Sequence, residues 1–294
     1  MNVKKLSGTL ILAIALCVVA NSCKKTDNGV ITDKLNHCES VLPYMDGLFI
    51  SNFGANVNNQ DASGSGYITF YSHGHNEVLI PSDGNLSKPR GMGIFKEHLF
   101  VCDVNSIVVY DLNDIAADPQ VILFPAEDLV VNDLVINSAG TLFASVTNTG
   151  RIYILDISNP DNINAASLLP YIEVPGPNGL VLDETRLYIA SSNPNGNFSE
   201  DNVLYIIDDV HHPELRHLTH TAGQYDGIAL SDDGTRLYFS DWNSGRIGYL
   251  TFENGEITYM PQSKPFEGPA DLTLHKGHLY VPDLLQSEVR EVKL

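Results

Sequence analysis

The stretch Asn178-Gly179-Leu180, followed after a turn by Leu187-Tyr188-Ile189-Ala190, is one copy of a unit that recurs along the chain. Each copy begins with a usually polar residue and a small or acidic one, continues with an apolar alternating run, and reaches a strand that opens with Leu and an aromatic residue. The first residues of the six copies are Glu39, Arg90, Asn132, Asn178, Asp226 and Ala270. Repeated strand-like segments of this kind predict an all-β fold.

The spacing of the copies predicts the architecture. They begin 51, 42, 46, 48 and 44 residues apart, which is the length of four short strands and their turns, one blade of a β-propeller. Asp232-Asp233-Gly234 and Asn254-Gly255 lie between apolar runs and suit the positive φ of tight hairpins. We therefore predict a six-bladed β-propeller with four-stranded blades over residues 38–294. The last copy has room for about three strands, so we expect residues 30–35 to supply the strand that closes the ring.

The N-terminus has the pattern of a bacterial lipoprotein signal peptide. A basic start, a short apolar run and small residues precede Cys23, so we expect residues 1–22 to be removed and Cys23 to be lipidated. Ordinary secretory cleavage nearby is the alternative. Residues 23–37 would then be the lipidated Cys and a polar tether. These expectations place the protein in the bacterial cell envelope, at a periplasmic or outer-membrane surface, with lipid as its only membrane attachment.

Charge and cysteine content exclude several classes of function. The net charge is −19 and becomes about −21 without residues 1–22, so the surface repels nucleic acid and anionic lipid. There is no Gly-x-Ser-x-Gly elbow, no phosphate-binding Gly-rich loop and no zinc-type Cys pair. Cys38 and Cys102 are the cysteines that remain in the propeller. We expect both to be buried apolar residues, with a single disulfide as the alternative.

The aligned first residues of the copies predict a metal site. All six fall at the start of the innermost strand, where side chains can point into the central channel. Four of them carry oxygen donors: Glu39, Asn132, Asn178 and Asp226. This donor set suits Ca²⁺, and Mg²⁺ or Mn²⁺ less well, whereas zinc more often has His or Cys ligands. Each residue alone has a structural reading as a turn former, but turn formers need not recur at the channel end of four blades.

Several of these segments resemble the senescence marker protein and gluconolactonase (regucalcin-like) family, and the resemblance spans residues 39–294. The segments that carry it are Cys38-Glu39-Ser40-Val41, Asn132-Asp133-Leu134, Pro177-Asn178-Gly179-Leu180, Tyr225-Asp226-Gly227 and Ser240-Asp241-Trp242. The resemblance implies that Glu39, Asn178 and Asp226 are direct ligands of one divalent metal, and that Asn132 touches the metal or the substrate. It also implies hydrolysis of a sugar lactone or similar ester.

We accordingly expect a metal-dependent lactone or ester hydrolase, with Asp226 as the group that transfers a proton from water; pure metal ligation is the alternative role of Asp226. Sugar-lactone relatives often have Arg two residues before the position of Asn132, where this chain has Val130, which leaves the substrate open. Arg90 is a candidate substrate contact, with a solvated or ion-paired structural role as the alternative. The competing function is a non-catalytic propeller that binds a sugar, peptide or envelope protein around a structural metal.

The histidines carry a weaker signal. A cluster lies between the fourth and fifth copies, at His211, His212, His217 and His220. Zinc binding is one reading of this cluster, and a solvated loop is the favoured one.

Overall fold

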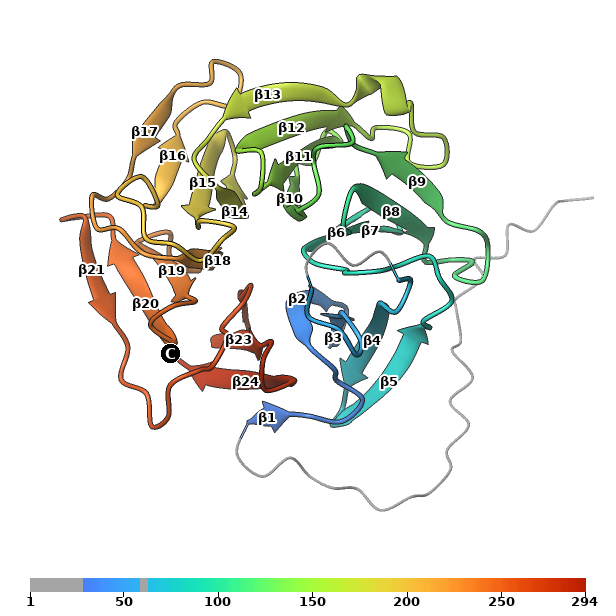
Figure 1. The fold of residues 1–294 in the computed structure, drawn as a ribbon, viewed down its shortest axis with the longest axis horizontal. Helices are drawn as coiled ribbons and strands as arrows, with labels where there is room; N and C mark the ends of the chain where they lie inside the picture. Colours follow the sequence, from blue (N-terminus) through green and yellow to red (C-terminus); the bar gives the residue numbers. More distant parts are fainter. Residues whose placement is uncertain (1–28, 59–62) are drawn as a thin grey trace, which may run out of the picture.

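The computed structural model describes residues 29–58 and 63–294, which form a ring of six four-stranded antiparallel sheets around a central channel (Figure 1). Blade one contains β2 (Cys38–Tyr44), β3 (Gly47–Asn52), β4 (Tyr67–Ser72) and β5 (His75–Ile80). Blade two contains β6 (Met92–Phe95), β7 (His98–Cys102), β8 (Ser106–Asp111) and β9 (Gln120–Leu123). Blade three contains β10 (Val131–Ile136), β11 (Thr141–Val146), β12 (Arg151–Asp156) and β13 (Leu169–Glu173). The six-bladed propeller predicted from the repeats is confirmed.

The second half of the ring follows the same order from the channel outward. Blade four contains β14 (Pro177–Asp183), β15 (Arg186–Ser191), β16 (Tyr205–Ile207) and β17 (Leu215–His217). Blade five contains β18 (Tyr225–Leu230), β19 (Arg236–Asp241), β20 (Arg246–Thr251) and β21 (Glu256–Tyr259). Blade six contains β22 (Thr273–His275), β23 (His278–Asp283), β24 (Glu288–Lys293) and β1 (Val30–Ile31). In the described parts of the chain the helical structure is one short 3₁₀ turn, Ala165–Ser167.

Blade six is closed by the N-terminal strand. β1 pairs antiparallel with β24 and aligns Val30 with Arg290 and Ile31 with Val289. The expected closing strand is thus confirmed for two residues, and it lies within the segment that we also expected to act as a tether. The signal peptide and Cys23 lie outside the described residues. Over the described ranges, no helix is both long enough and apolar enough to span a membrane.

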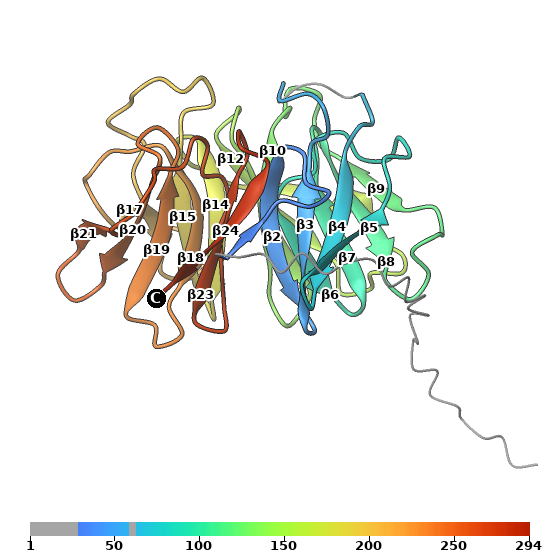
Figure 2. The same cartoon turned by 90° about the horizontal axis from the view of Figure 1, so that it is seen from below.

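The core lies between the blades. Six clusters of buried hydrophobic residues each join two neighbouring sheets around the ring. Because both faces of a blade are covered, the second strands are apolar at nearly every position instead of alternating: β7 reads His-Leu-Phe-Val-Cys and is buried throughout. Figure 2 shows the sheets from the side, with the longer loops gathered at one end of the ring.

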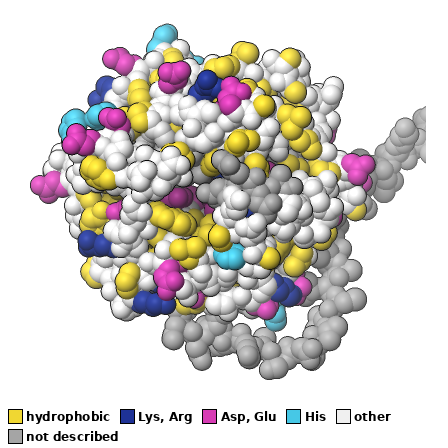
Figure 3. All heavy atoms as spheres, viewed as in Figure 1, with side chains coloured by type: hydrophobic (Ala, Val, Ile, Leu, Met, Phe, Trp, Pro, Cys, Tyr) yellow, Lys and Arg dark blue, Asp and Glu magenta, His cyan; other side chains and the backbone are white. Residues whose placement is uncertain are grey.

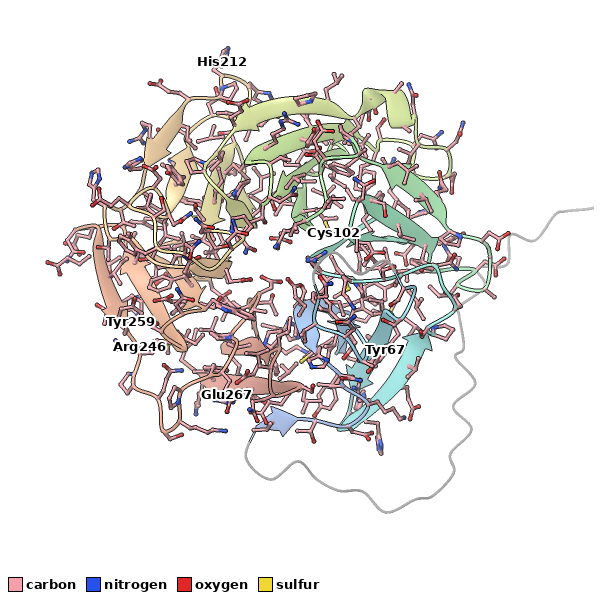
Figure 4. All side chains as sticks on the ribbon, in the orientation of Figure 1. Tyr67, Cys102, His212, Arg246, Tyr259 and Glu267 are labelled. Carbon is pink, nitrogen blue, oxygen red and sulfur yellow. The ribbon has the colours of Figure 1, made fainter. Side chains whose placement is uncertain are left out.

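Two local predictions can be checked directly. Gly234 and Gly255 both have φ of +68°, so the hairpins predicted at these glycines use the backbone conformation that glycine favours. Cys38 and Cys102 are both buried and unbonded, as expected. The Cys38 thiol donates to the carbonyl oxygen of Glu288 at 3.3 Å, and Cys102 lies on β7 beside the channel (Figure 4). Burial raises the pKa of both thiols, which makes them unreactive.

Candidate functional site

The channel side chains are positioned by bulges in four innermost strands. The pairing of β2, β10, β14 and β18 with their neighbours shifts register at the first two residues of the repeat. In a regular strand two consecutive side chains point to opposite faces, whereas a bulge re-aims them. In β10, Asn132 lines one cavity in the channel and Asp133 lines a second cavity. The bulges therefore give the channel two layers of side chains.

Serines on the second strands hold these bulges in place. The Ser145 hydroxyl accepts a hydrogen bond from the Asp133 N–H at 3.0 Å and donates to the Asn178 carbonyl oxygen of the next blade at 2.7 Å. Ser240 does the same in blade five, accepting from the Gly227 N–H at 2.9 Å and donating to the Ala270 carbonyl oxygen at 2.6 Å. The serines that end the Leu-aromatic segments of blades three and five thus link each bulge to the innermost segment of the next blade.

The first layer surrounds a cavity of about 560 Å³. All six aligned residues of the repeats line it: Glu39, Arg90, Asn132, Asn178, Asp226 and Ala270. In the space-filling view, acidic atoms are visible within a hollow near the middle of this face, with hydrophobic side chains around them (Figure 3). The structure therefore brings together every residue that the sequence placed at the channel end of the blades.

Two carboxylate oxygens in this cavity have no hydrogen-bond partner. Glu39 is 5 % exposed, and its Oε2 is buried without a partner. The Oδ1 of Asp226 is likewise buried and unpartnered, while its Oδ2 accepts from Asn178 Nδ2 at 3.2 Å. Asn178 Nδ2 also donates to Ser192 Oγ at 2.9 Å, which leaves the Asn178 Oδ1 as the atom of that amide able to bind a cation.

Both carboxyl groups of the first layer have raised pKa values. Burial raises the pKa of Asp226 to about 7; the charge of Asp271 adds to this, and the bond from Asn178 and the charge of Arg90 oppose it. Burial, and then the charges of Asp226 and Asp271, also raise the pKa of Glu39 well above its usual range. Close, buried, like-charged groups stabilise each other's neutral forms.

Arg90 provides positive charge in the cavity wall. It is 1 % exposed, so the solvated position that we considered for it is wrong. Its guanidinium lies 5.2 Å from the centre of the Phe53 ring and donates from Nη1 to the Lys88 carbonyl oxygen at 3.2 Å. Burial lowers the pKa of Arg90, and the charge of Glu39 opposes this most strongly. One guanidinium thus lines the same cavity as two carboxyl groups that each have one oxygen without a partner.

The second layer also contains carboxyl groups, and their oxygens are bonded. Asp133 Oδ1 and Oδ2 accept from the N–H groups of Leu134 and Leu180, both at 2.7 Å. In Asp271, Oδ1 accepts from the Leu272 N–H at 2.7 Å and Oδ2 from Ser40 Oγ at 2.6 Å. These acids line a separate cavity of about 330 Å³. They tie neighbouring blades together at the centre of the ring.

The first layer fits a hard divalent cation. Buried carboxylate oxygens without a donor are costly unless a cation or proton satisfies them, and the first layer has two such oxygens beside an amide oxygen. These are the ligand types that Ca²⁺ prefers. Within the described residues no group of three or more His, Cys, Asp or Glu side chains is arranged to hold a metal, since two of the four donors here are amides.

The histidine cluster does not form one site. His212, at the outer edge of the ring (Figure 4), contacts Asp209 at 2.9 Å through Nδ1. His217 and His220 approach each other, with their Nδ1 atoms 3.3 Å apart. All three histidine side chains are exposed. Elsewhere on the outer edge the exposed Arg246 lies over the half-buried Tyr259, with its guanidinium carbon 3.9 Å from the ring centre (Figure 4).

Sequence reasoning missed the apolar part of the cavity. Phe53, Ala270 and Leu284 form a small buried cluster with Trp242 packed against it, and all four line the cavity. Lys88 was also missed: it is fully buried, and its Nζ donates to the Asn56 carbonyl oxygen at 2.5 Å and lies 5.4 Å from the Phe53 ring centre. Phe53, Trp242 and Leu284 each directly follow the second strand of their blade, so a second aligned position of the repeat could have located them.

Comparison with known proteins supports the fold. No known family model matches the chain, and no curated protein matches it. Similar solved structures include a structural-genomics protein of unknown function from Bacteroides thetaiotaomicron, with 12 % identity, a TM-score of 0.62, and 90 % of this chain and 71 % of that chain covered. Streptogramin B lyase has 12 % identity and a TM-score of 0.60, with 90 % and 96 % covered. A chain of a nidogen/laminin complex has 13 % identity and a TM-score of 0.59, with 86 % and 92 % covered.

At these identities the likeness concerns the fold alone. The neighbours include an enzyme, a component of a protein complex and a protein of unknown function, and one propeller fold hosts many functions. The argument for function therefore depends on the cavity and its residues.

Proposed function

We propose that this protein binds one divalent cation, calcium in preference to magnesium, manganese or zinc, in the first layer of the channel and hydrolyses a lactone or related ester there. The observation that supports the proposal best is the pair of buried, unpartnered oxygens of Glu39 and Asp226 beside the oriented amide of Asn178. Glu39, Asn178 and Asp226 would be the ligands, with Asn132 as a further ligand or a substrate contact.

Such a cation supplies positive charge that polarises an ester carbonyl. Asp226 is placed to take a proton from an attacking water because it lines the cavity and its Oδ1 has no hydrogen-bond partner. Asn178 orients Asp226 through the bond to Oδ2. Arg90 and Asn132 line the same cavity and are placed to bind oxygen atoms of a substrate.

The test is proton release from a panel of aldonolactones and acyl lactones, followed with and without chelator. We expect calcium-dependent turnover by the wild type and a loss of about 10²- to 10⁴-fold in Asp226→Ala. Asp46→Ala is the matched control, because Asp46 is an exposed carboxylate on the turn between β2 and β3, and it should keep full activity.

Two results would contradict the proposal in different ways. Turnover that chelator does not change would remove the role of the cation. Calcium should raise the melting temperature under both functions, because a ligand that binds the folded state stabilises it. Calcium-dependent stabilisation without turnover of any substrate would therefore favour the second function, a binding propeller with a structural cation.

Attachment to the cell envelope stays part of the proposal. Cys23 and the signal peptide lie outside the described residues. We propose that the mature protein starts at a lipidated Cys23. Mass spectrometry of the protein from its native membrane would detect a diacylglyceryl group on Cys23, and a Cys23→Ala variant should be released into the soluble fraction.

A further inference from the structure

The walls of the first-layer cavity differ in chemistry from one side of the ring to the other. Blades three and four contribute hydrogen-bonding side chains, among them Asn132, Thr147, Asn178 and Ser192. Blades one, five and six contribute Glu39 and Asp226 and also most of the apolar side chains, Phe53, Val57, Trp242, Ala270, Leu284 and Leu285, which we call the apolar wall. Because blades three and four lie across the ring from blades six and one (Figure 1), their hydrogen-bonding side chains face the blade-one and blade-six part of the apolar wall over the cavity.

The apolar wall extends from the buried part of the cavity to solvent. Phe53, Ala270 and Leu284 are buried in one cluster with Trp242 against it. Beyond them, Val57 is 44 % exposed and Leu285 is 46 % exposed, and both line the same cavity. Exposed apolar side chains that continue a buried apolar wall inside a cavity form a surface that a ligand can cover.

A small, uniformly hydroxylated ligand would leave this wall in water. The apolar wall contributes to binding mainly when apolar ligand atoms cover it and remove its surface from water. The cavity, at about 560 Å³, is also in the size range of sites for drug-sized ligands. The hydrogen-bonding wall and the two carboxyl groups, in contrast, favour a polar group with a carbonyl or hydroxyl oxygen.

We infer that the substrate is an amphipathic lactone or ester, whose reacting group lies against the carboxyl groups and blades three and four, and whose alkyl or aryl substituent covers the apolar wall of blades one, five and six. This inference rests on the proposed function and narrows its substrate class from sugar lactones to lactones that carry an apolar substituent. Leu285 and Val57 are then the residues that set specificity for that substituent.

Binding can be measured without turnover because Trp242, on the apolar wall, is the single tryptophan of the sequence. Its fluorescence should report ligands that cover the wall. In calcium buffer we would titrate the protein with γ-lactams that carry alkyl chains of zero to eight carbons, which resist hydrolysis, and with gluconolactone. We expect affinity to rise about threefold to fourfold for each methylene that contacts the wall, and gluconolactone to bind more weakly than the octyl lactam.

The variant Val57→Asn/Leu285→Asn should lose most of this dependence on chain length and keep its affinity for the unsubstituted lactam. Leu123→Asn is the matched control, since Leu123 is 69 % exposed on β9 and does not line the cavity, and it should behave as wild type.

A parallel assay of alkyl lactone hydrolysis separates the amphipathic-ligand inference from the proposed hydrolase function. Chain-length-dependent binding without hydrolysis would contradict the proposed function and support the amphipathic ligand. Affinity that is independent of chain length, or tighter binding of gluconolactone than of the octyl lactam, would overturn the inference whatever the turnover.

Discussion

The two layers of the channel contain the same chemical group in different surroundings. In the second layer the carboxyl oxygens of Asp133 and Asp271 accept from backbone N–H groups and a serine hydroxyl. In the first layer one oxygen of Glu39 and one of Asp226 are buried with no partner. Glu39 and Asp133 are both buried, so the difference between the layers lies in how far their carboxyl oxygens are hydrogen-bonded. This difference indicates an architectural role for the second layer and supports our proposal of a cation site in the first.

The comparison also shows why residue type alone was a weak guide. Asn132 and Asp133 are adjacent in sequence, and the acidic member of the pair is the one fixed by the backbone. The bulge in β10 sends the amide to the first layer and the acid to the second. Substitutions in each layer should therefore have opposite sensitivities to calcium.

The largest effect is expected for Gly227→Ala in the second layer. A Cβ at this position would lie 2.5 Å from the carbonyl carbon of Asp271, which is backbone of the neighbouring blade and has no room to move. We expect a loss of more than about 3 kcal/mol in the free energy of unfolding, the same with and without calcium. Chemical denaturation monitored by circular dichroism measures it. A loss below 1 kcal/mol would show that the two blades are not in close contact at this point.

Asp133→Asn should have the next largest effect. The amide has one accepting atom in place of two, so either the Leu134 or the Leu180 N–H would face an NH₂ group. We expect about 3 kcal/mol of destabilisation from the buried, unsatisfied donors, again independent of calcium. Thermal unfolding in calcium and in chelator measures it, and a calcium-dependent loss would move Asp133 into the binding layer.

Asp226→Asn should behave in the opposite way. The pKa of Asp226 is raised in the folded protein, from 3.8 to about 7, so the folded form binds more protons between these values. The contribution of Asp226 to the stability of the calcium-free wild type is therefore complete below about pH 4 and lost as the pH rises through about 7. At pH 8 in chelator, Asp226→Asn should be more stable than wild type by a few kcal/mol.

In saturating calcium the order of these two proteins should reverse, because the variant loses a ligand. Calorimetry of both proteins at pH 5 and pH 8, each with calcium and with chelator, measures these differences in stability. If the variant is less stable than wild type at pH 8 in chelator as well, the carboxylate of Asp226 is satisfied by the protein itself.

The smallest effect is expected for Ser192→Ala. This change removes the hydroxyl that accepts from Asn178 Nδ2 at 2.9 Å and leaves the bond from Asn178 to Asp226. We expect calcium affinity to fall about threefold through looser positioning of the amide, with little change in stability. Isothermal titration calorimetry measures it. An unchanged affinity would show that Asn178 does not need Ser192 for its orientation.

The sequence predicted the parts of the molecule that repeat. The blade count, the hairpins at Gly234 and Gly255, and the shared location of the six aligned residues all follow from the periodic pattern. The repeat also predicted the channel end of each blade, because an aligned position in a ring of equivalent sheets points to the same place in each.

The apolar part of the cavity was not predicted because its residue type does not repeat. Phe53, Trp242 and Leu284 directly follow the second strands of three blades, at a position where blades three and four have Thr147 and Ser192. The bulges were also invisible, since a register shift depends on pairing between strands and leaves no fixed residue signature. Arg90 and Lys88 are buried cations that both lie over the ring of Phe53, a residue distant in sequence.

The closure of blade six has a consequence for the order of folding. β1 is made first among the described strands, yet its partner β24 begins only at Glu288. Blades one to five can each pair locally as they are synthesised, whereas the seam of the ring must wait for the most distant contact in the chain. An unclosed ring would expose an unpaired strand edge during that interval, so the chain should be most prone to aggregate before β1 and β24 have paired.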